Sequence, residues 1–268
     1  MRDNPVTALF KGAGYLIEGF GLITRPRLRR FVIVPLLVNV VLFAGLLIGG
    51  GWYGGGYLVG QTQELLPGWL DWIAWLLIPI LVIALLAAAF FGFALVANLI
   101  ASPFNGLLAE AVENRITGAR IDQKTGLLSL LKEVGIAITG ELRKLIYVVP
   151  RMLLLLPLLL FVPVVGPLLW VLFGAWMLAL SFADYPMGNH GHRFTQQRVI
   201  LAQRRWYALG FGLATTAALT VPVLNFFVMP SAVAGATVMW VRLWPDGAAA
   251  APPGGPASGP HSGPQSGR

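Results

Sequence analysis

Four long apolar stretches dominate the pattern of hydrophobic and polar positions along this chain. Residues 31–51 and 69–101 are continuous, whereas residues 145–182 and 207–241 are each interrupted once near the middle. A transmembrane helix needs about 20 apolar residues to cross a hydrocarbon core roughly 30 Å thick. The pattern therefore predicts an all-α membrane protein with two long transmembrane helices and two helical hairpins that are broken at proline.

The two interruptions contain residues that end helices. Pro163, Gly166 and Pro167 lie in the break at residues 161–167, and Pro222 lies in the break at residues 220–225. Each break leaves two apolar helices of about 15–18 residues, or roughly 23–27 Å. Each pair is therefore either a tight transmembrane hairpin or a wedge that turns back before crossing fully. Interrupted apolar segments in successive halves of a chain are also typical of transport sites.

Helical periodicity also occurs outside these stretches. Near the N-terminus, apolar residues recur at helical spacing at Val6, Leu9, Phe10, Ala13, Ile17 and Phe20. They predict an amphipathic helix that either lies along the membrane surface or packs on the protein's own cytoplasmic side. In the loop over residues 102–144, the same spacing predicts two cytoplasmic or interfacial helices separated by residues 117–119.

The C-terminal segment has a different composition. Residues 246–268 are rich in Ala, Pro, Gly and Ser and carry almost no apolar bulk, so we expect a disordered tail there. Residues 1–245 then form a single helical membrane domain.

Overall composition agrees with a membrane protein. Of 268 residues, 57% are hydrophobic and only 11% are charged, whereas soluble chains carry about 25% charged residues. A soluble enzyme fold is therefore excluded. The chain contains no cysteine, which rules out disulfides, thiolate metal sites and cysteine nucleophiles.

The net charge of +8 is concentrated in particular loops. Lys and Arg number six in residues 1–30, six in residues 102–144 and four in residues 183–206, and none lies in the loop over residues 52–68 or in either proline-containing break. The positive-inside rule therefore assigns the basic loops and both termini to the cytoplasm. Such an excess first indicates an anionic membrane surface and not nucleic acid.

Residues 25–30, with the sequence RPRLRR, form the clearest candidate site. Pro26 suits the first turn of a helix, where a missing N–H costs nothing. Free N–H groups and the positive end of the helix dipole favour an anion, and Arg27, Arg29 and Arg30 lie within the same turn. An oxyanion such as sulfate or phosphate fits this arrangement. The alternative is a plain cytoplasmic stop whose only anions are lipid headgroups.

A second group of polar residues stands where an apolar stretch ends, at Asn98, Ser102, Asn105 and Gly106. These residues either line a cavity or simply stop one helix and cap the next. Glu110 and Glu113 follow one turn apart, and we expect them to pair on the helix surface with Arg115 or a basic loop.

Arg151 lies six residues inside an apolar stretch, behind Glu141, Arg143 and Lys144. Burying it is costly, which makes it a candidate for function. Its side chain can also extend to the lipid headgroups.

Metal and enzyme motifs are weak or missing. His190 and His192 are two residues apart, but no third ligand is evident, so we expect an ordinary capped loop there and no metal or cofactor. The sequence has no G-x-x-x-x-G-K-[ST] loop, His-Glu-x-x-His pair or Gly-x-Ser-x-Gly turn. We therefore expect no ATP hydrolysis by the P-loop route and no enzyme activity.

Several of these strings together resemble the CysZ family of bacterial sulfate permeases. The resemblance spans about residues 10–242 and rests on RRFVIVPLLVN at 29–39, SPFNGLLAE at 102–110, AWMLA at 175–179, DYP at 184–186 with Asn189 and His190, MP at 229–230 and MWV at 239–241. One departure is Arg27, where the family often has glycine. That glycine lets backbone N–H groups approach an anion closely, and here the Arg27 side chain is the substitute.

The resemblance implies a helical inner-membrane protein that admits sulfate for assimilatory reduction and cysteine biosynthesis, and that forms oligomers. It implies sulfate and membrane lipids as partners, a homo-oligomer and no nucleic acid. Sulfate is a dianion without a proton to donate, so a site made only of donors suits it. We expect it at Arg27, Leu28, Arg29 and Arg30, with a pathway along Asn98, Ser102, Asn105, Gly106, Glu110, Glu141 and Arg151.

The expected route is channel-like or secondary, and proton coupling through Glu110, Glu141 or Asp184 is left open. Two rival functions are a transporter for another oxyanion, such as sulfite, thiosulfate or molybdate, and a non-transporting scaffold or regulator whose basic face binds lipids.

Overall fold

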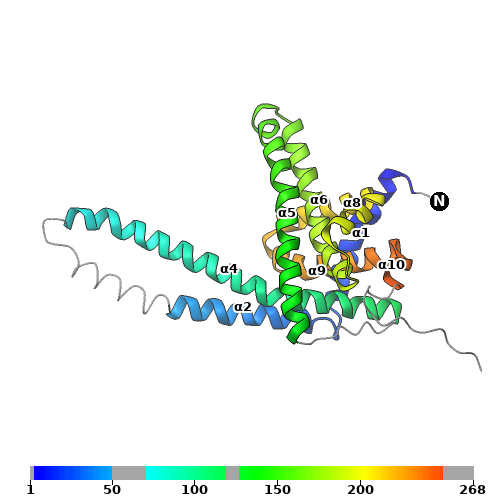
Figure 1. Ribbon diagram of the computed structural model, residues 1–268, viewed down its shortest axis with the longest axis horizontal. Helices are drawn as coiled ribbons and strands as arrows, with labels where there is room; N and C mark the ends of the chain where they lie inside the picture. The colour runs from blue at the N-terminus through cyan, green and yellow to red at the C-terminus, as the bar shows by residue number, and fades with distance from the viewer. Residues whose placement is uncertain (1–2, 50–70, 119–126, 250–268) are drawn as a thin grey trace, which may run out of the picture. The chain divides into compact units, whose positions relative to one another are not determined.

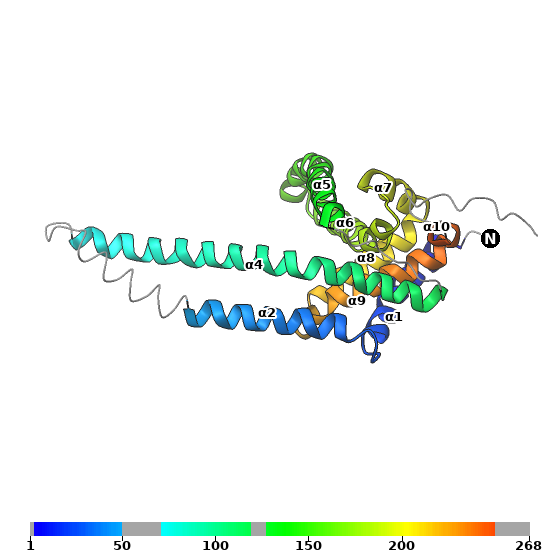
Figure 2. The ribbon, with the colours of Figure 1, turned by 60° about the horizontal axis from the view of Figure 1, so that its bottom comes forward.

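The computed structural model describes residues 3–49, 71–118 and 127–249, and inside some helices, including residues 94–103 and 127–142, it describes the backbone alone. No strand occurs among these residues, and the prediction of an all-α membrane protein is confirmed. The helices, labelled in Figures 1 and 2, are α1 (Pro5–Ile23), α2 (Arg30–Gly49), α4 (Asp71–Thr117), α5 (Leu127–Phe161), α6 (Val165–Asn189), α7 (Phe194–Gln203), α8 (Arg205–Leu219), α9 (Pro222–Leu243) and α10 (Pro245–Ala249).

The chain forms two compact units, one of Arg25–Leu108 and one of Met1–Thr24 with Ala109–Arg268. In the first unit, α2 and the first part of α4 run side by side in opposite directions, as Figures 1 and 2 both show. The Phe43 and Phe93 rings meet edge to face at 5.3 Å between these two helices. An antiparallel pair of apolar helices is thus the framework of this unit.

Helix α4 is longer than predicted. It continues without a break through Pro103, where the sequence suggested that one helix stops and another begins, and it ends at Thr117. Gly118 follows with a φ of 71°, a left-handed conformation that suits glycine at a helix end. Of the two alternatives for this segment, the helix stop is excluded, because Leu108, Ala109 and Val112 are fully buried and packing beyond the proline favours continued helix over a turn.

The predicted second cytoplasmic helix is likewise not separate. It is continuous with the first half of the next apolar stretch and forms the 35-residue helix α5, which contains Pro150 and Pro157. The prediction of two independent helices between residues 102 and 144 is therefore wrong, although the break near Thr117 is present. Ala119, the last residue of that break, lies outside the described residues.

Both predicted hairpin breaks are confirmed. Helix α5 ends at Phe161 and α6 begins at Val165, while α8 ends at Leu219 and α9 begins at Pro222. At the first turn, the Val162 N–H donates to the Leu158 carbonyl at 3.0 Å and Val164 has a φ of 72°. Phe161 and Val164 are 80% and 79% exposed, so this turn presents apolar side chains to its surroundings.

Helix α1 packs against α8 and α9 in the second unit. Its approach is close because a Cβ at Gly12 would meet the Tyr207 carbonyl oxygen, and one at Gly19 would meet that of Ser231. Of the two predicted positions for this helix, packing on the protein is confirmed. The face is different, however, since Phe10 and Ile17 of the predicted apolar stripe are 75% and 71% exposed.

An ion pair also joins α1, near the N-terminus, to α9, near the C-terminus. The Arg242 guanidinium on α9 donates two hydrogen bonds of 2.7 Å to the Glu18 carboxylate on α1. Both side chains are largely exposed, so a pair of this kind contributes at most about 1 kcal/mol. Glycine-mediated packing, and not this pair, holds α1 in place.

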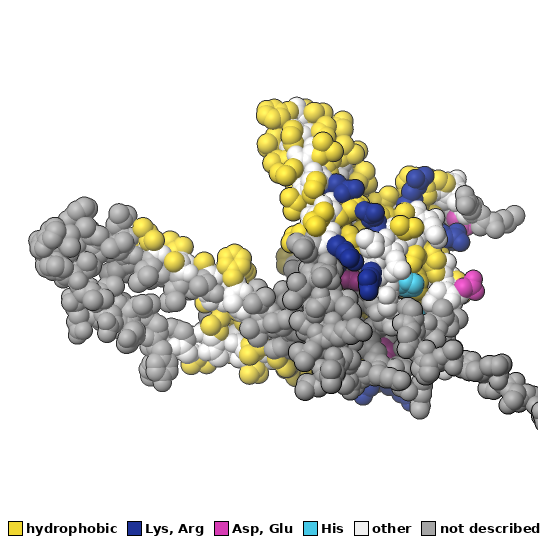
Figure 3. Space-filling model, in the orientation of Figure 1, with side chains coloured by type: hydrophobic (Ala, Val, Ile, Leu, Met, Phe, Trp, Pro, Cys, Tyr) yellow, Lys and Arg dark blue, Asp and Glu magenta, His cyan; other side chains and the backbone are white. Residues whose placement is uncertain are grey.

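Four described helical segments are long and apolar enough to cross a membrane: α1, Arg143–Phe161 of α5, α6 and α9. Their surroundings differ, because most of α9 is buried inside the protein whereas none of Arg143–Phe161 is. Figure 3 shows hydrophobic side chains covering the α5–α6 hairpin. This bare apolar surface is suited to lipid or to another protein chain, and not to water.

Helix α10 includes residues 246–249 of the predicted tail. The rest of that tail lies outside the described residues, so its disorder stays a prediction.

Candidate functional site

The arginine-rich segment folds as a tight turn before α2. The N–H groups of Leu28 and Arg29 both donate to the Arg25 carbonyl, at 2.9 and 3.0 Å. Helix α2 itself begins at Arg30, so Pro26 lies in this preceding turn and not, as predicted, in the first turn of the spanning helix. The turn brings Arg27, Leu28, Arg29 and Arg30 together within one short loop.

The side chains of this turn differ in exposure. Leu28 is 2% exposed and anchors the turn, while Arg27, Arg29 and Arg30 are exposed. Among the described residues no carboxylate pairs with these three arginines, and the Arg30 guanidinium lies over the Phe31 ring at 4.9 Å. The result is a surface of N–H donors only, the chemistry that a fully ionised oxyanion requires.

The polar residues of α4 share one face by helical register. Asn98, Ser102 and Asn105 follow at spacings of four and three residues, which keeps them on one side of a helix. Asn105 is 6% exposed, while Gly106 and Glu110 are half-buried. The side chains of Asn98 and Ser102 lie outside the description.

Glu113 lies further along α4, in the other unit. It is fully buried, and its Oε1 lies 2.7 Å from Nε2 of His190 at the end of α6, which is 4% exposed. The His190 ring also lies 5.9 Å from the Trp240 ring on α9. The expected surface pairing of Glu113 is therefore wrong, and so is the solvated loop around His190.

Sequence reasoning missed this buried pair because the glutamate was judged by its charge alone. The available signal was its position directly after the apolar residues Leu108, Ala109 and Val112, which the structure shows to be buried. Among the described residues no group of three His, Asp or Glu side chains is placed to hold a metal ion.

Asp184 connects three helices next to this pair. Its carboxylate accepts from the Lys144 ammonium on α5 at 2.7 Å and from the Gln197 amide on α7 at 2.6 Å. Gln197 also donates to the His192 carbonyl at 2.8 Å. These bonds fix α7 against the base of the α5–α6 hairpin.

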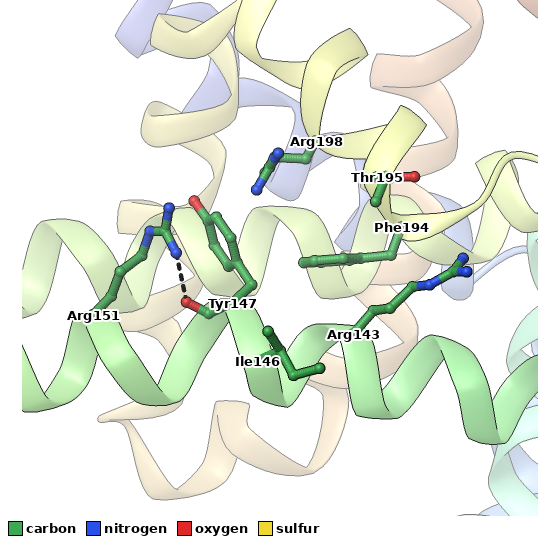
Figure 4. A pocket seen from close by; sticks show the side chains of 7 residues that line it. All are labelled: Arg143, Ile146, Tyr147, Arg151, Phe194, Thr195 and Arg198. Carbon is green, nitrogen blue, oxygen red and sulfur yellow. Dashed lines mark hydrogen bonds between the residues drawn. The ribbon is translucent and has the colours of Figure 1, made fainter.

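Arg151 lines a hollow of about 330 Å³ between α5 and α7. Its side chain is exposed on the surface of α5. Its guanidinium lies 3.7 Å from the Tyr147 ring centre and donates to the Tyr147 carbonyl at 2.8 Å. Figure 4 shows the Tyr147 ring between Arg151 and Arg198, with Arg143 on the same wall of α5 as Tyr147.

The predicted site residues fall in both units. Arg27, Leu28, Arg29, Arg30, Asn98, Ser102, Asn105 and Gly106 belong to Arg25–Leu108, whereas Glu110, Glu141 and Arg151 belong to the other unit. The Glu141 side chain lies outside the description. Each group is accordingly described separately.

A family model described as "Sulfate transporter CysZ/Etoposide-induced protein 2.4" matches residues 15–230. The chain belongs to this family. The match covers the arginine turn, the polar face of α4, the Glu113–His190 pair and the hollow at Arg151. The resemblance seen in the sequence is thereby confirmed.

Similar proteins match nearly the whole chain. The sulfate transporter CysZ of Salmonella typhimurium is 42% identical over 251 residues, which is 91% of this chain and 97% of the relative. The sulfate transporter CysZ of Vibrio parahaemolyticus is 41% identical over 241 residues, which is 86% of this chain and 94% of the relative. Together with its four apolar helices, the match identifies the chain as a multi-pass membrane protein of a transporter family.

Proposed function

We propose that this chain is a sulfate permease that mediates sulfate uptake for assimilatory reduction and cysteine biosynthesis. The observation that carries the proposal is the alignment, along 91% of the chain, with a relative named a sulfate transporter. The membrane is the bacterial inner membrane, with the basic loops and both termini cytoplasmic, in accord with the positive-inside rule.

The arginine turn is the proposed site of sulfate recruitment. Sulfate is a dianion at neutral pH and needs donors alone, and Arg27, Leu28, Arg29 and Arg30 supply guanidinium and backbone N–H groups in one short loop. The N–H groups of Arg27 and Arg30 take no part in the two hydrogen bonds to the Arg25 carbonyl. Arg27 contributes a side chain where the family often has glycine.

The proposed pathway uses the polar face of α4, with Asn98, Ser102, Asn105, Gly106 and Glu110. Amides and hydroxyls hold an anion weakly, and conduction requires successive contacts that release the ion as readily as they bind it. Glu110, Glu141 and Arg151 are the proposed members of the pathway in the second unit.

The proposed mode of transport is channel-like or secondary. No P-loop motif is present in the sequence, so uptake proceeds without ATP hydrolysis by that route. If protons are coupled, Glu110, Glu141 or Asp184 carries them, and Asp184 already accepts from Lys144.

We further propose that the chain forms a homo-oligomer in contact with membrane lipids. The unburied apolar surface of Arg143–Phe161 supports this, because such a surface is suited to a second chain or to acyl tails. The domain division proposed from sequence, with a membrane domain over residues 1–245 and a tail over 246–268, is retained.

Uptake of radiolabelled sulfate into proteoliposomes that contain the purified full chain tests the function. We expect saturable uptake without ATP, and excess unlabelled sulfate should inhibit it more strongly than sulfite, thiosulfate or molybdate does. Stronger inhibition by one of those ions would assign a different oxyanion. Folded protein that admits none of them would instead support a scaffold or regulator.

A further inference from the structure

The hollow between α5 and α7 has a basic wall, of which the proposed transport pathway uses only Arg151. Its charged lining residues are Arg143 and Arg151 on α5 and Arg198 on α7, and no acidic residue lines it. Among the described side chains no carboxylate forms an ion pair with any of these arginines. Three uncompensated guanidinium groups around a hollow of about 330 Å³ favour an anionic ligand.

Tyr147 organises this basic wall. The guanidinium of Arg151 lies 3.7 Å from the centre of its ring and that of Arg198 lies 4.8 Å from it. The ring in turn meets Phe194 edge to face at 5.6 Å, which joins α5 to the start of α7. Thr195 of α7 also lines the hollow. Two of the arginines are thus held by aromatic contact, so binding an anion costs them little side-chain entropy.

The surface next to the hollow is apolar. Arg143 is the first residue of the candidate span Arg143–Phe161, and none of that segment is buried inside the protein. Leu154 follows Tyr147 by seven residues, which places both on one face of the helix, and Leu154 and the lining residue Ile146 are 71% and 65% exposed. Arg151 follows Arg143 by eight residues, or roughly 12 Å along the helix. The hollow therefore lies where a polar headgroup layer would give way to hydrocarbon.

We propose that this hollow binds the phosphate headgroup of an anionic phospholipid, with the acyl chains along the exposed face of α5. A phosphate diester presents two oxygens that share a negative charge to the arginine forks, and the acyl tails of the lipid cover Ile146 and Leu154. A free oxyanion satisfies the arginines alone and leaves this apolar face without a partner. The inference goes beyond the proposed transport function and does not depend on it.

Lipid titration of the purified full chain tests the proposal. Phosphatidylglycerol and phosphatidylcholine with identical acyl chains are added separately to the protein in a neutral detergent, and bound lipids are counted by native mass spectrometry. The intact protein should bind phosphatidylglycerol roughly tenfold more tightly than phosphatidylcholine. Equal affinity for the two lipids would overturn the proposal.

Two variants with the same net charge locate the binding. Arg143→Gln with Arg198→Gln should abolish the preference for phosphatidylglycerol. Arg204→Gln with Arg205→Gln removes the same charge from exposed positions outside the hollow and should preserve the preference. If both double variants lose the preference for phosphatidylglycerol equally, the lipid is attracted by the net charge of the protein, and the hollow is not a binding site.

A third variant separates a shaped site from a charged surface. Thr195 is exposed, so Thr195→Trp is tolerated by the fold, and its indole fills the hollow without changing any charge. We expect weaker binding of phosphatidylglycerol, and unchanged binding would contradict the proposal. Inorganic sulfate or phosphate that binds without lipid, with the same dependence on Arg143 and Arg198, would overturn it in favour of a free-ion site.

Discussion

Oε1 of Glu113 and Nε2 of His190 lie 2.7 Å apart in the interior, although 77 residues separate the two in the chain. The contact joins the end of α4 to the end of α6 and lies beside Trp240 of α9. Both side chains are buried, at 0% and 4% exposure. Buried polar groups are expensive to leave without a partner, so the pair specifies how these three helices meet.

The first prediction concerns this pair. Glu113→Ala removes the partner of a buried histidine and should lower the free energy of unfolding by about 1–3 kcal/mol. Glu113→Gln keeps an amide oxygen that can accept from Nε2–H, so it should cost clearly less. Thermal unfolding of both variants in detergent, followed by tryptophan fluorescence, compares them. Equal destabilisation would mean that side-chain volume, and not the hydrogen bond, is what matters.

The second prediction concerns the glycines of α1. Gly19→Ala places a Cβ against the Ser231 carbonyl oxygen and 2.8 Å from the Gly235 nitrogen. Overpacking of this kind costs about 1–3 kcal/mol, so the melting temperature should fall.

Gly14→Ala is the matched control, because no atom lies within 4 Å of the added Cβ. It should raise stability by about 1 kcal/mol through helix propensity. Opposite signs for the two alanines are the expected result. Two changes of the same sign would show that α1 does not pack through its glycines.

The third prediction concerns the arginine turn. Arg29→Ala with Arg30→Ala removes two donors that we assign to sulfate and should weaken sulfate binding roughly tenfold or more. Direct binding of labelled sulfate to purified protein at constant ionic strength measures the effect. Arg204→Ala with Arg205→Ala lowers the net charge equally and should leave the affinity near that of the unchanged protein. If Arg29→Ala with Arg30→Ala binds sulfate as tightly as the unchanged protein does, the arginine turn is not the sulfate site.

The fourth prediction concerns His192, which lies between α6 and α7. Burial, and then the nearby charge of His190, lowers the pKa of His192 from its ordinary value of 6.5. The unfolded chain therefore binds more protons than the folded chain just below that pH. Stability is fully present above about pH 6.5 and falls as the pH drops through this range.

Replacing His192 should remove its contribution to the pH dependence of stability. In His192→Gln, the melting temperature should fall less between pH 7 and pH 5 than it does in the unchanged protein, by the linkage above. His261→Gln, outside the described residues, is the control and should keep the original slope. Identical slopes for His192→Gln and the unchanged protein would assign the pH dependence of stability to other groups.

Apolar length and proline position predicted the helical class and both hairpin turns, because these features depend on local sequence. Proline near residue 103 misled the prediction, since a local turn signal was outweighed by burial of Leu108 and Val112 further along the same helix. The inner face of α1 was also misread. Glycine has no hydrophobicity to detect, yet Gly12 and Gly19 leave no room for a Cβ against the neighbouring helices.

Among the site residues, exposed arginines such as Arg29 and Arg30 could be predicted, because a cluster of charged residues is evident in the sequence. Sequence reasoning missed the Glu113–His190 pair and the hollow lined by Arg143 and Arg198. Each joins residues that are far apart in sequence, on α4 and α6 or on α5 and α7. Pairings of this kind arise only when the helices are placed in three dimensions.

The packing of α1 against α8 and α9 has a consequence for biosynthesis. Its ion-pair partner Arg242 follows Glu18 by 224 residues, so α1 leaves the ribosome long before the helices that cover its glycine face. At 5–20 residues per second the delay is roughly 10–45 s. During that interval the membrane or a chaperone must shield the helix, and the second unit closes only when the last long helix has been made.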